Sequence, residues 1–161
     1  MDKLTALVPV TPLLSALLVT LFAGRMGRRG VARLSVGLST LTFLLAVAVL
    51  AFYLAQPQPQ WVALGTGWGS LYLDPLSAIM ALAVAGISLV VHVYSVRYMA
   101  EEPGYARFYA LLDLMTVAIL LMVAAGDLIT LLVAWHLVGV LLYFLLGHDM
   151  QRPAAQRYAF W

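Results

Sequence analysis

The feature that most constrains this chain is a series of long apolar runs that contain no charged residue. Leu4 to Gly24 is the first such run, and Leu128 to Gly147 contains His136 and Tyr143 as its only ionisable residues. Both runs reach the length of about 20 residues that an α-helix needs to cross a bilayer. Hydrophobic residues make up 64% of the 161 residues and charged residues only 10%, so a soluble domain could not bury this apolar surface. The sequence therefore predicts an all-α, polytopic transmembrane helix bundle.

The breaks between the runs predict five spans and the start of a sixth in a single transmembrane domain. The alternating prolines of residues 56–60 favour extended backbone and end the second span. Asp74 and Pro75 are the residue types of a helix N-cap and a first helical position, so they open the third span. Asp127 is interpreted as the cap of the fifth span, which should form a tight antiparallel pair with the fourth. The domain covers residues 1–161, with spans at about 4–24, 34–55, 75–96, 108–126 and 128–147 and a sixth beginning at about 154. The extracytoplasmic loop at 56–74 contains an interfacial hairpin from Trp61 to Leu73.

Basic residues gather in alternate connections, which predicts the orientation. They follow the first, third and fifth spans and are absent from the connections between, so the positive-inside rule places those three connections in the cytoplasm. The N-terminus then lies outside, and Lys3 is the one basic residue that disagrees. The agreeing residues are Arg25, Arg28, Arg29, Arg33, Arg97, Arg107, Arg152 and Arg157.

Several classes of function are excluded by composition. The chain has no cysteine, which excludes disulfides, thiolate metal sites and cysteine-ligated iron–sulfur clusters. The glycines of residues 65–69 lie in no strand–turn–helix unit, so they are not a nucleotide fingerprint. No basic stripe with interleaved aromatic residues indicates nucleic acid. We therefore expect no cofactor, no metal and no nucleic-acid partner for this chain.

Ionisable residues inside the predicted spans are candidates for proton or ion translocation. Counted at about 1.5 Å per residue from the cytoplasmic ends, His92 lies about 6 Å deep, Asp113 about 8 Å and His136 about 16 Å. His92 and Asp113 could reach each other, whereas His136 would need helix tilt or a bridging water. A stepped series of titratable groups is what a proton relay requires.

His136 belongs to a stripe that we expect to point into protein. Gly139, Tyr143 and Gly147 follow it at i+3, i+7 and i+11, where the small residues allow close helix packing and the phenol can extend a hydrogen-bond chain. The alternative for His136 is a structural hydrogen bond between helices.

The shallower candidates have structural alternatives as well. The His92 ring can reach the membrane interface from one turn inside, which is the interpretation that we favour for it. Asp113 can contact water or Arg107 at its shallow depth.

Four local patterns between Asp74 and Trp161 resemble one family of membrane proteins. It is the antiporter-like family that includes the largest membrane subunit of complex I (NADH dehydrogenase subunit 5) and the A subunit of Mrp-type sodium/proton antiporters. The patterns are Leu73-Asp74-Pro75-Leu76-Ser77, Val91-His92-Val93-Tyr94-Ser95 with Tyr98-Met99, Pro103-Gly104-Tyr105-Ala106-Arg107-Phe108-Tyr109-Ala110, and Ala134-Trp135-His136-Leu137-Val138-Gly139 with Tyr143-Phe144-Leu145-Leu146-Gly147.

The resemblance implies a subunit that helps to move protons or sodium within a larger complex of hydrophobic subunits. As an enzyme it would be at most a non-redox, ion-translocating part of a translocase such as NADH-quinone oxidoreductase. The family has a glutamate after the tryptophan, thought to pair with a lysine on a later helix, whereas this chain has His136. Because an imidazole and a carboxylate gain opposite charge on ionisation, a glutamate–lysine switch could not operate unchanged.

A second resemblance is to a divergent branch of this family. Together with His136, the stretches Gly147-His148-Asp149 and Arg152-Pro153-Ala154-Ala155 resemble the proton-conducting membrane subunits of DAB-type inorganic carbon uptake systems. Those subunits work with a cytoplasmic, zinc-containing protein related to carbonic anhydrases.

Three functions follow as hypotheses for an integral protein of the bacterial inner membrane. The first is a proton- or sodium-translocating antiporter-like subunit, here an N-terminal portion. The second is the membrane subunit of an inorganic carbon (CO2/bicarbonate) uptake system driven by proton flow. The third is a structural assembly subunit without ion conduction. We also expect more chain beyond Trp161, because an apolar segment ending there would leave backbone groups unsatisfied in lipid.

Overall fold

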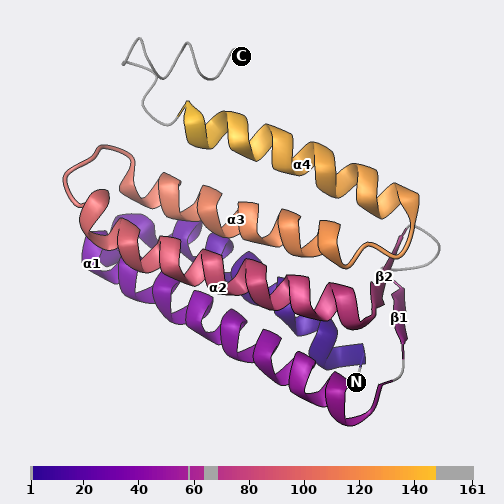
Figure 1. Cartoon of the computed structure of the whole chain (residues 1–161). Helices are drawn as coiled ribbons and strands as arrows, with labels where there is room; N and C mark the ends of the chain where they lie inside the picture. The colour runs from indigo at the N-terminus through magenta and orange to yellow at the C-terminus, as the bar shows by residue number, and fades with distance from the viewer. Residues whose placement is uncertain (1, 58, 64–68, 148–161) are drawn as a thin grey trace.

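The computed structural model is a helix bundle with one small β-hairpin at its edge (Figure 1). It describes residues 2–57, 59–63 and 69–147, of which residues 2–5 are described by their backbone alone. The predicted sixth span and the patterns at residues 148–155 lie outside this range. The elements are α1 (Asp2–Ala55), β1 (Gln60–Ala63), β2 (Ser70–Leu73), α2 (Pro75–Tyr98), α3 (Tyr105–Val123) and α4 (Leu128–Leu146).

Helix α1 consists of two helical halves joined at Gly27, which has the non-helical angles φ 64° and ψ 173°. The second half runs back beside the first (Figure 1), and the 2.7 Å contact between the hydroxyls of Thr11 and Thr42 joins them. The sequence predicted a loop over residues 25–33, but this region is helical on both sides of a single reversing residue. Glycine makes this possible, because residues with a side chain rarely adopt these backbone angles.

The bundle interior has apolar clusters at its two ends and polar side chains between them. The cluster near the hairpin includes Val8, Ala46, Val49, Tyr53, Leu73 and Leu120. The cluster near Gly27 includes Val19, Val31, Met99, Tyr105 and Tyr109. Burial every three or four residues along each helix is the pattern of a helix with one interior face. Hydroxyl-bearing residues occupy that face midway along each half of α1, so the polar layer is enclosed at both ends.

The predicted hairpin is present as two antiparallel strands, in which Gln60 pairs with Leu73 and Ala63 with Ser70. The second strand also contacts the connection between α3 and α4, where the Tyr72 amide donates to the Ala124 carbonyl at 2.7 Å. This pairing explains why α3 ends at Val123, three residues before the predicted end of the fourth span. The Ala124 carbonyl and the Gly126 amide bond to β2, while the amides of Ala124 and Ala125 still bond to carbonyls of α3. The chain therefore leaves the helix where its backbone begins to pair with β2.

Two aspartates begin helices as the sequence predicts. Asp74 accepts a hydrogen bond from the Ser77 amide at 2.7 Å, and Pro75 follows as the first residue of α2. Asp127 accepts from the Thr130 amide at 2.8 Å and caps α4. It also accepts from the Ser70 hydroxyl at 2.8 Å, so the same carboxylate joins the hairpin to the helix bundle.

The helices are suited to a membrane. Four described helices, with the bent α1 counted once, are long and apolar enough to cross a bilayer. Helix α4 lies at the side of the bundle against α3 (Figure 1), and most of its apolar side chains are exposed. The protein is therefore an integral membrane protein of mostly helical structure.

Candidate functional site

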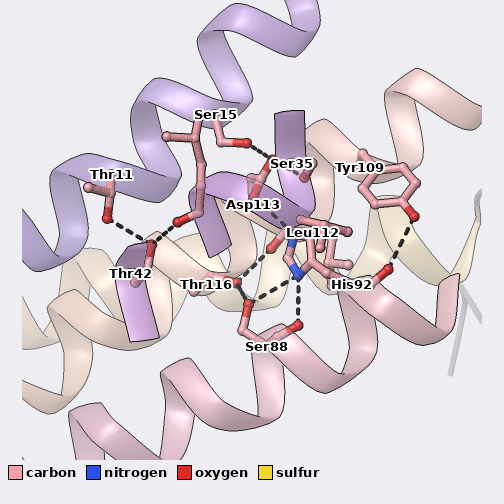
Figure 2. Close-up of polar contacts among 12 residues, drawn as sticks. Thr11, Ser15, Ser35, Thr42, Ser88, His92, Tyr109, Leu112, Asp113 and Thr116 are labelled. Atoms are coloured by element: carbon pink, nitrogen blue, oxygen red, sulfur yellow. Dashed lines mark hydrogen bonds and ion pairs between the residues drawn. The ribbon is translucent and has the colours of Figure 1, made fainter. Parts of the chain in front are cut away.

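Two titratable side chains from neighbouring helices meet in the interior of the bundle. His92 on α2 and Asp113 on α3 are both fully buried, and the His92 Nε2 atom lies 3.0 Å from Asp113 Oδ1 (Figure 2). The prediction that His92 reaches the membrane interface is therefore wrong, because its ring points inward to a carboxylate. Asp113 has hydrogen-bond partners on α1 and α2, and none of the contacts found for it among the described residues involves Arg107.

Helix α1 supplies the other partners of Asp113 from both of its halves. The Ser15 hydroxyl donates to Oδ2 at 2.6 Å, and the Ser35 hydroxyl donates to the same atom at 2.8 Å. The bend at Gly27 makes this possible, since it brings residues 20 positions apart in sequence to one carboxyl group.

The hydrogen bonds of His92 determine how many protons the pair carries. Nδ1 lies 2.7 Å from the Ser88 carbonyl oxygen, which can only accept, so Nδ1 carries a hydrogen. Nε2 faces Asp113 Oδ1, and a lone pair facing a carboxylate would be repulsive, so this contact also contains a proton. The pair is therefore an imidazolium–carboxylate pair or its neutral tautomer, with a net charge of zero. Removing one proton would leave a buried negative charge, which is strongly unfavourable in an apolar interior.

Further hydroxyl groups surround the pair. The Ser88 and Thr116 hydroxyls lie 2.7 Å apart, and Thr116 donates to the Leu112 carbonyl at 3.0 Å. Ser88 Oγ lies 3.3 Å from His92 Nδ1 and is a second, weaker acceptor for its hydrogen. Tyr109 donates to the His92 backbone carbonyl at 3.2 Å. These contacts fix the ring orientation and cover it from the Gly27 end of the bundle.

A second group of hydroxyls lies farther toward the hairpin. Pro12 lacks an amide hydrogen, so the Val8 carbonyl has no helical donor four residues later. The Thr11 hydroxyl donates to this carbonyl at 3.0 Å and also contacts Thr42. A helix-interrupting proline in the first half of α1 is thereby compensated by a neighbouring side chain.

His136 is not brought to the His92–Asp113 pair. Its ring is exposed on α4, and Nδ1 donates to the Leu132 carbonyl of its own helix at 2.6 Å. An open apolar groove of about 410 Å³ surrounds it, lined by Leu132, Trp135, His136, Gly139 and Val140.

The prediction that the His136 stripe points into protein is not met within the described residues. A Cβ atom on Gly139 would have no neighbour within 4 Å, and Tyr143 is partly exposed with its ring against Phe144. Only Gly147, the C-cap of α4, is buried.

Sequence reasoning missed the hydroxyl groups that complete the site. Ser15, Ser35, Ser88 and Thr116 were not singled out, because isolated serine and threonine residues are common in transmembrane helices. A usable signal was the periodicity, since Ser35, Ser39 and Thr42 recur at i, i+4 and i+7 and so share one helix face. Among the described residues, no three His, Cys, Asp or Glu side chains gather as a metal site would require.

Comparison with known proteins finds relatives among membrane subunits of energy-converting complexes. Residues 61–109 match the family model for the N-terminus of NADH-ubiquinone oxidoreductase (complex I) chain 5. All of this chain is 64% identical to the probable inorganic carbon transporter subunit DabB1 of Halothiobacillus neapolitanus, of which it covers 29%. It is 31% identical to the F(420)H(2) dehydrogenase subunit L of Methanosarcina mazei and 29% identical to the NADH-quinone oxidoreductase subunit L of Neisseria meningitidis serogroup A. Those matches include 96% and 92% of this chain and 24% of each relative, so the chain spans less than a third of the length of these curated relatives.

The fold also matches a solved structure. A chain of the membrane-bound sulfane sulfur reductase, an archaeal respiratory membrane complex, superimposes with a TM-score of 0.89 at 21% sequence identity. The match covers 99% of this chain and 33% of that one. The helix arrangement, including the reversal of α1, is therefore shared with a respiratory membrane subunit.

Proposed function

Since the chain belongs to the family of antiporter-like membrane subunits, of which it matches the N-terminal portion, we propose that it contributes to proton movement within a multi-subunit membrane complex. The observation that carries this proposal is the His92–Asp113 pair, a fully buried titratable pair in a bundle whose two ends are apolar. Ionisable groups inside a membrane are costly, and transport is the usual reason for their presence.

The pair has the properties of a proton-holding site. Its geometry requires a proton between Nε2 and Oδ1, and the proton can lie on either atom while the net charge stays at zero. Loss of the proton creates a buried anion, so release should occur only when a cation or a second proton arrives. Sodium remains the alternative ion for the complete protein.

Proton-driven inorganic carbon uptake is the more specific function that we propose. The identity of 64% with DabB1 is about twice the identity with the two dehydrogenase subunits over a similar length. The second hypothesis from sequence is therefore preferred over a respiratory complex. A cytoplasmic, zinc-containing, carbonic-anhydrase-like protein is the soluble partner that this function calls for.

We further propose five transmembrane segments for this chain, with both halves of α1 crossing the membrane. The N-terminus and the hairpin would lie outside, and Gly27 with its neighbouring arginines would lie in the cytoplasm of a bacterial inner membrane. In this orientation the His92–Asp113 pair is nearer to the cytoplasmic surface than to the hairpin. The exposed His136 face of α4 would contact a further helix of the complex.

The test uses the complete protein in its native complex, purified in mild detergent with every co-purifying chain identified. A zinc-containing soluble partner supports carbon uptake, whereas a set of hydrophobic respiratory subunits supports the dehydrogenase alternative. The complex is then reconstituted in liposomes, and proton entry along an imposed gradient is followed with an internal pH dye. Absence of proton entry in the wild-type complex would contradict the proposed function and favour an assembly role.

A further inference from the structure

A row of buried hydroxyl groups runs between the two halves of α1. Thr11 and Ser15 lie one helical turn apart on the first half, while Ser35, Ser39 and Thr42 share one face of the second half. All five side chains are at most 5% exposed. We call this row the α1 seam. It begins at Asp113, which accepts hydrogen bonds from Ser15 and Ser35, and ends toward the hairpin at the Thr11–Thr42 contact (Figure 2).

Ser39 is the one member of the α1 seam whose hydroxyl is without a protein partner. Its exposed fraction is 2%, and its Oγ atom makes no hydrogen bond to any described residue. A buried hydroxyl left unpaired costs about 1–3 kcal/mol. The neighbouring Thr40 hydroxyl, by contrast, donates to the Val36 carbonyl at 2.8 Å. The unpaired group therefore lies within the polar row, where a small polar ligand could satisfy it.

We propose that the α1 seam binds water at Ser39 and that this water connects the Thr11–Thr42 contact to Asp113. Along the helix axis Ser39 is about 6 Å from Ser35 and about 4.5 Å from Thr42. One water on each side of Ser39, with hydrogen bonds of about 2.8 Å to Ser39 and to the next hydroxyl, can bridge gaps of about this size. Ordered water commonly satisfies buried polar groups in this manner. The seam then forms a hydrogen-bonded route for protons between the hairpin half of the bundle and the His92–Asp113 pair, a role that rests on the proposed function.

Apolar side chains close both ends of the α1 seam and so limit where this proton route can open. Toward the hairpin, the seam is followed by the apolar side chains of Val8, Ala46, Val49 and Tyr53. Toward Gly27, Tyr109 and the neighbouring apolar cluster lie beyond the pair. Water in the seam is therefore enclosed in this conformation. Separation of the apolar side chains at the hairpin end would connect it with the solvent on that side.

Cysteine substitution tests the water directly, because this chain contains no cysteine. Ser39→Cys is prepared in the complete protein with its other cysteines replaced, and the reaction of the thiol with Ag⁺ is followed in the membrane. Ala46→Cys is the matched control, since Ala46 is 1% exposed on the same face of α1 but lies in the apolar cluster. A thiol reacts as its thiolate, which requires water, so we expect Ser39→Cys to react about tenfold faster or more. Equal rates would overturn the proposal.

Proton transport separates the water site from its role in the route. Ser39→Val fills the site with methyl groups and should remove most of the proton entry measured in liposomes, whereas Thr40→Ala should leave it unchanged. Full proton entry in Ser39→Val would overturn the route. If the wild-type complex shows no proton entry, the proposed function fails, and the Ag⁺ reaction still decides whether the seam contains water.

Discussion

Substitutions in the His92–Asp113 pair should affect stability and proton transport in different ways. In His92→Ala, the Asp113 carboxyl group remains buried with the Ser15 and Ser35 hydroxyls but has lost the ring that shares its proton. Breaking a buried ion pair from one side costs about 3–5 kcal/mol. For a unit of this size, each kcal/mol lowers the midpoint of thermal unfolding by about 2–4 °C, so we expect a decrease of about 6–20 °C.

Asp113→Asn should behave differently, although it also removes one member of the pair. The amide nitrogen of asparagine can donate to His92 Nε2, and the amide oxygen can accept from both serines. A neutral His92 with its hydrogen on Nδ1 keeps the bond to the Ser88 carbonyl. Every hydrogen bond is then retained, so we expect a change in unfolding free energy of no more than about 1 kcal/mol. Proton entry should nevertheless fall to background, because the exchangeable proton between the two side chains is gone.

The double variant provides the decisive comparison. Adding Asp113→Asn to His92→Ala removes the unpaired charge and leaves only an incompletely bonded amide, which costs about 1–3 kcal/mol. The double variant should therefore unfold at a higher temperature than His92→Ala alone. The measurement is thermal unfolding of the purified complex, with proton entry into liposomes measured in parallel. If Asp113→Asn is as destabilising as His92→Ala, or the double variant is the least stable, the protonation state inferred from the hydrogen bonds is wrong.

Three further predictions concern the connections between helices. Gly27→Ala forces a residue with a side chain into the backbone conformation of Gly27, which costs about 1–3 kcal/mol, so it should lower the thermal midpoint without altering the chemistry of the site. An unchanged midpoint would mean that the reversal does not need glycine. Gly126→Ala should cost about 1–3 kcal/mol, because the added methyl group would meet Ser70 Oγ at 2.8 Å and Trp61 at 2.9 Å, and faster proteolysis of the hairpin should report its release. Hydrogen bonds from the Thr130 backbone and from Ser70 lower the pKa of Asp127 from 3.8 to about 2, so its contribution to stability is complete above about pH 4 and is lost as the pH falls toward 2. The thermal midpoint measured between these pH values should fall less in Asp127→Ala than in the wild type, and equal slopes would contradict this assignment.

The residues at which helices begin could be predicted from the sequence, because an N-cap depends only on its neighbouring residues. Asp74 with Pro75, and Asp127, act within one helical turn of themselves, so their caps could be predicted without knowledge of the fold. The hairpin was likewise indicated by its local composition. The end of α3 was not, because Val123 is followed by residues that pair with β2, a strand about 50 positions earlier.

The candidate site was only partly predictable, for a physical reason. The depths of His92 and Asp113 indicated that they could meet, but depth alone does not give the direction in which a side chain points. The His92 ring points inward to Asp113 of α3, and Asp113 is itself bonded to hydroxyl groups from both halves of α1. His136 shows the opposite case, since a central position in an apolar run suggested an interior role and the described structure leaves its ring on an open face.

The reversal at Gly27 also has a consequence for how the protein is made. Only one residue separates the two helical halves of α1. Because no long loop connects them, one half cannot insert into the membrane independently of the other. Each half alone would present serine and threonine hydroxyls to lipid, whereas the joined halves turn them toward each other. Insertion during synthesis should therefore proceed with both halves entering together, as one helical hairpin.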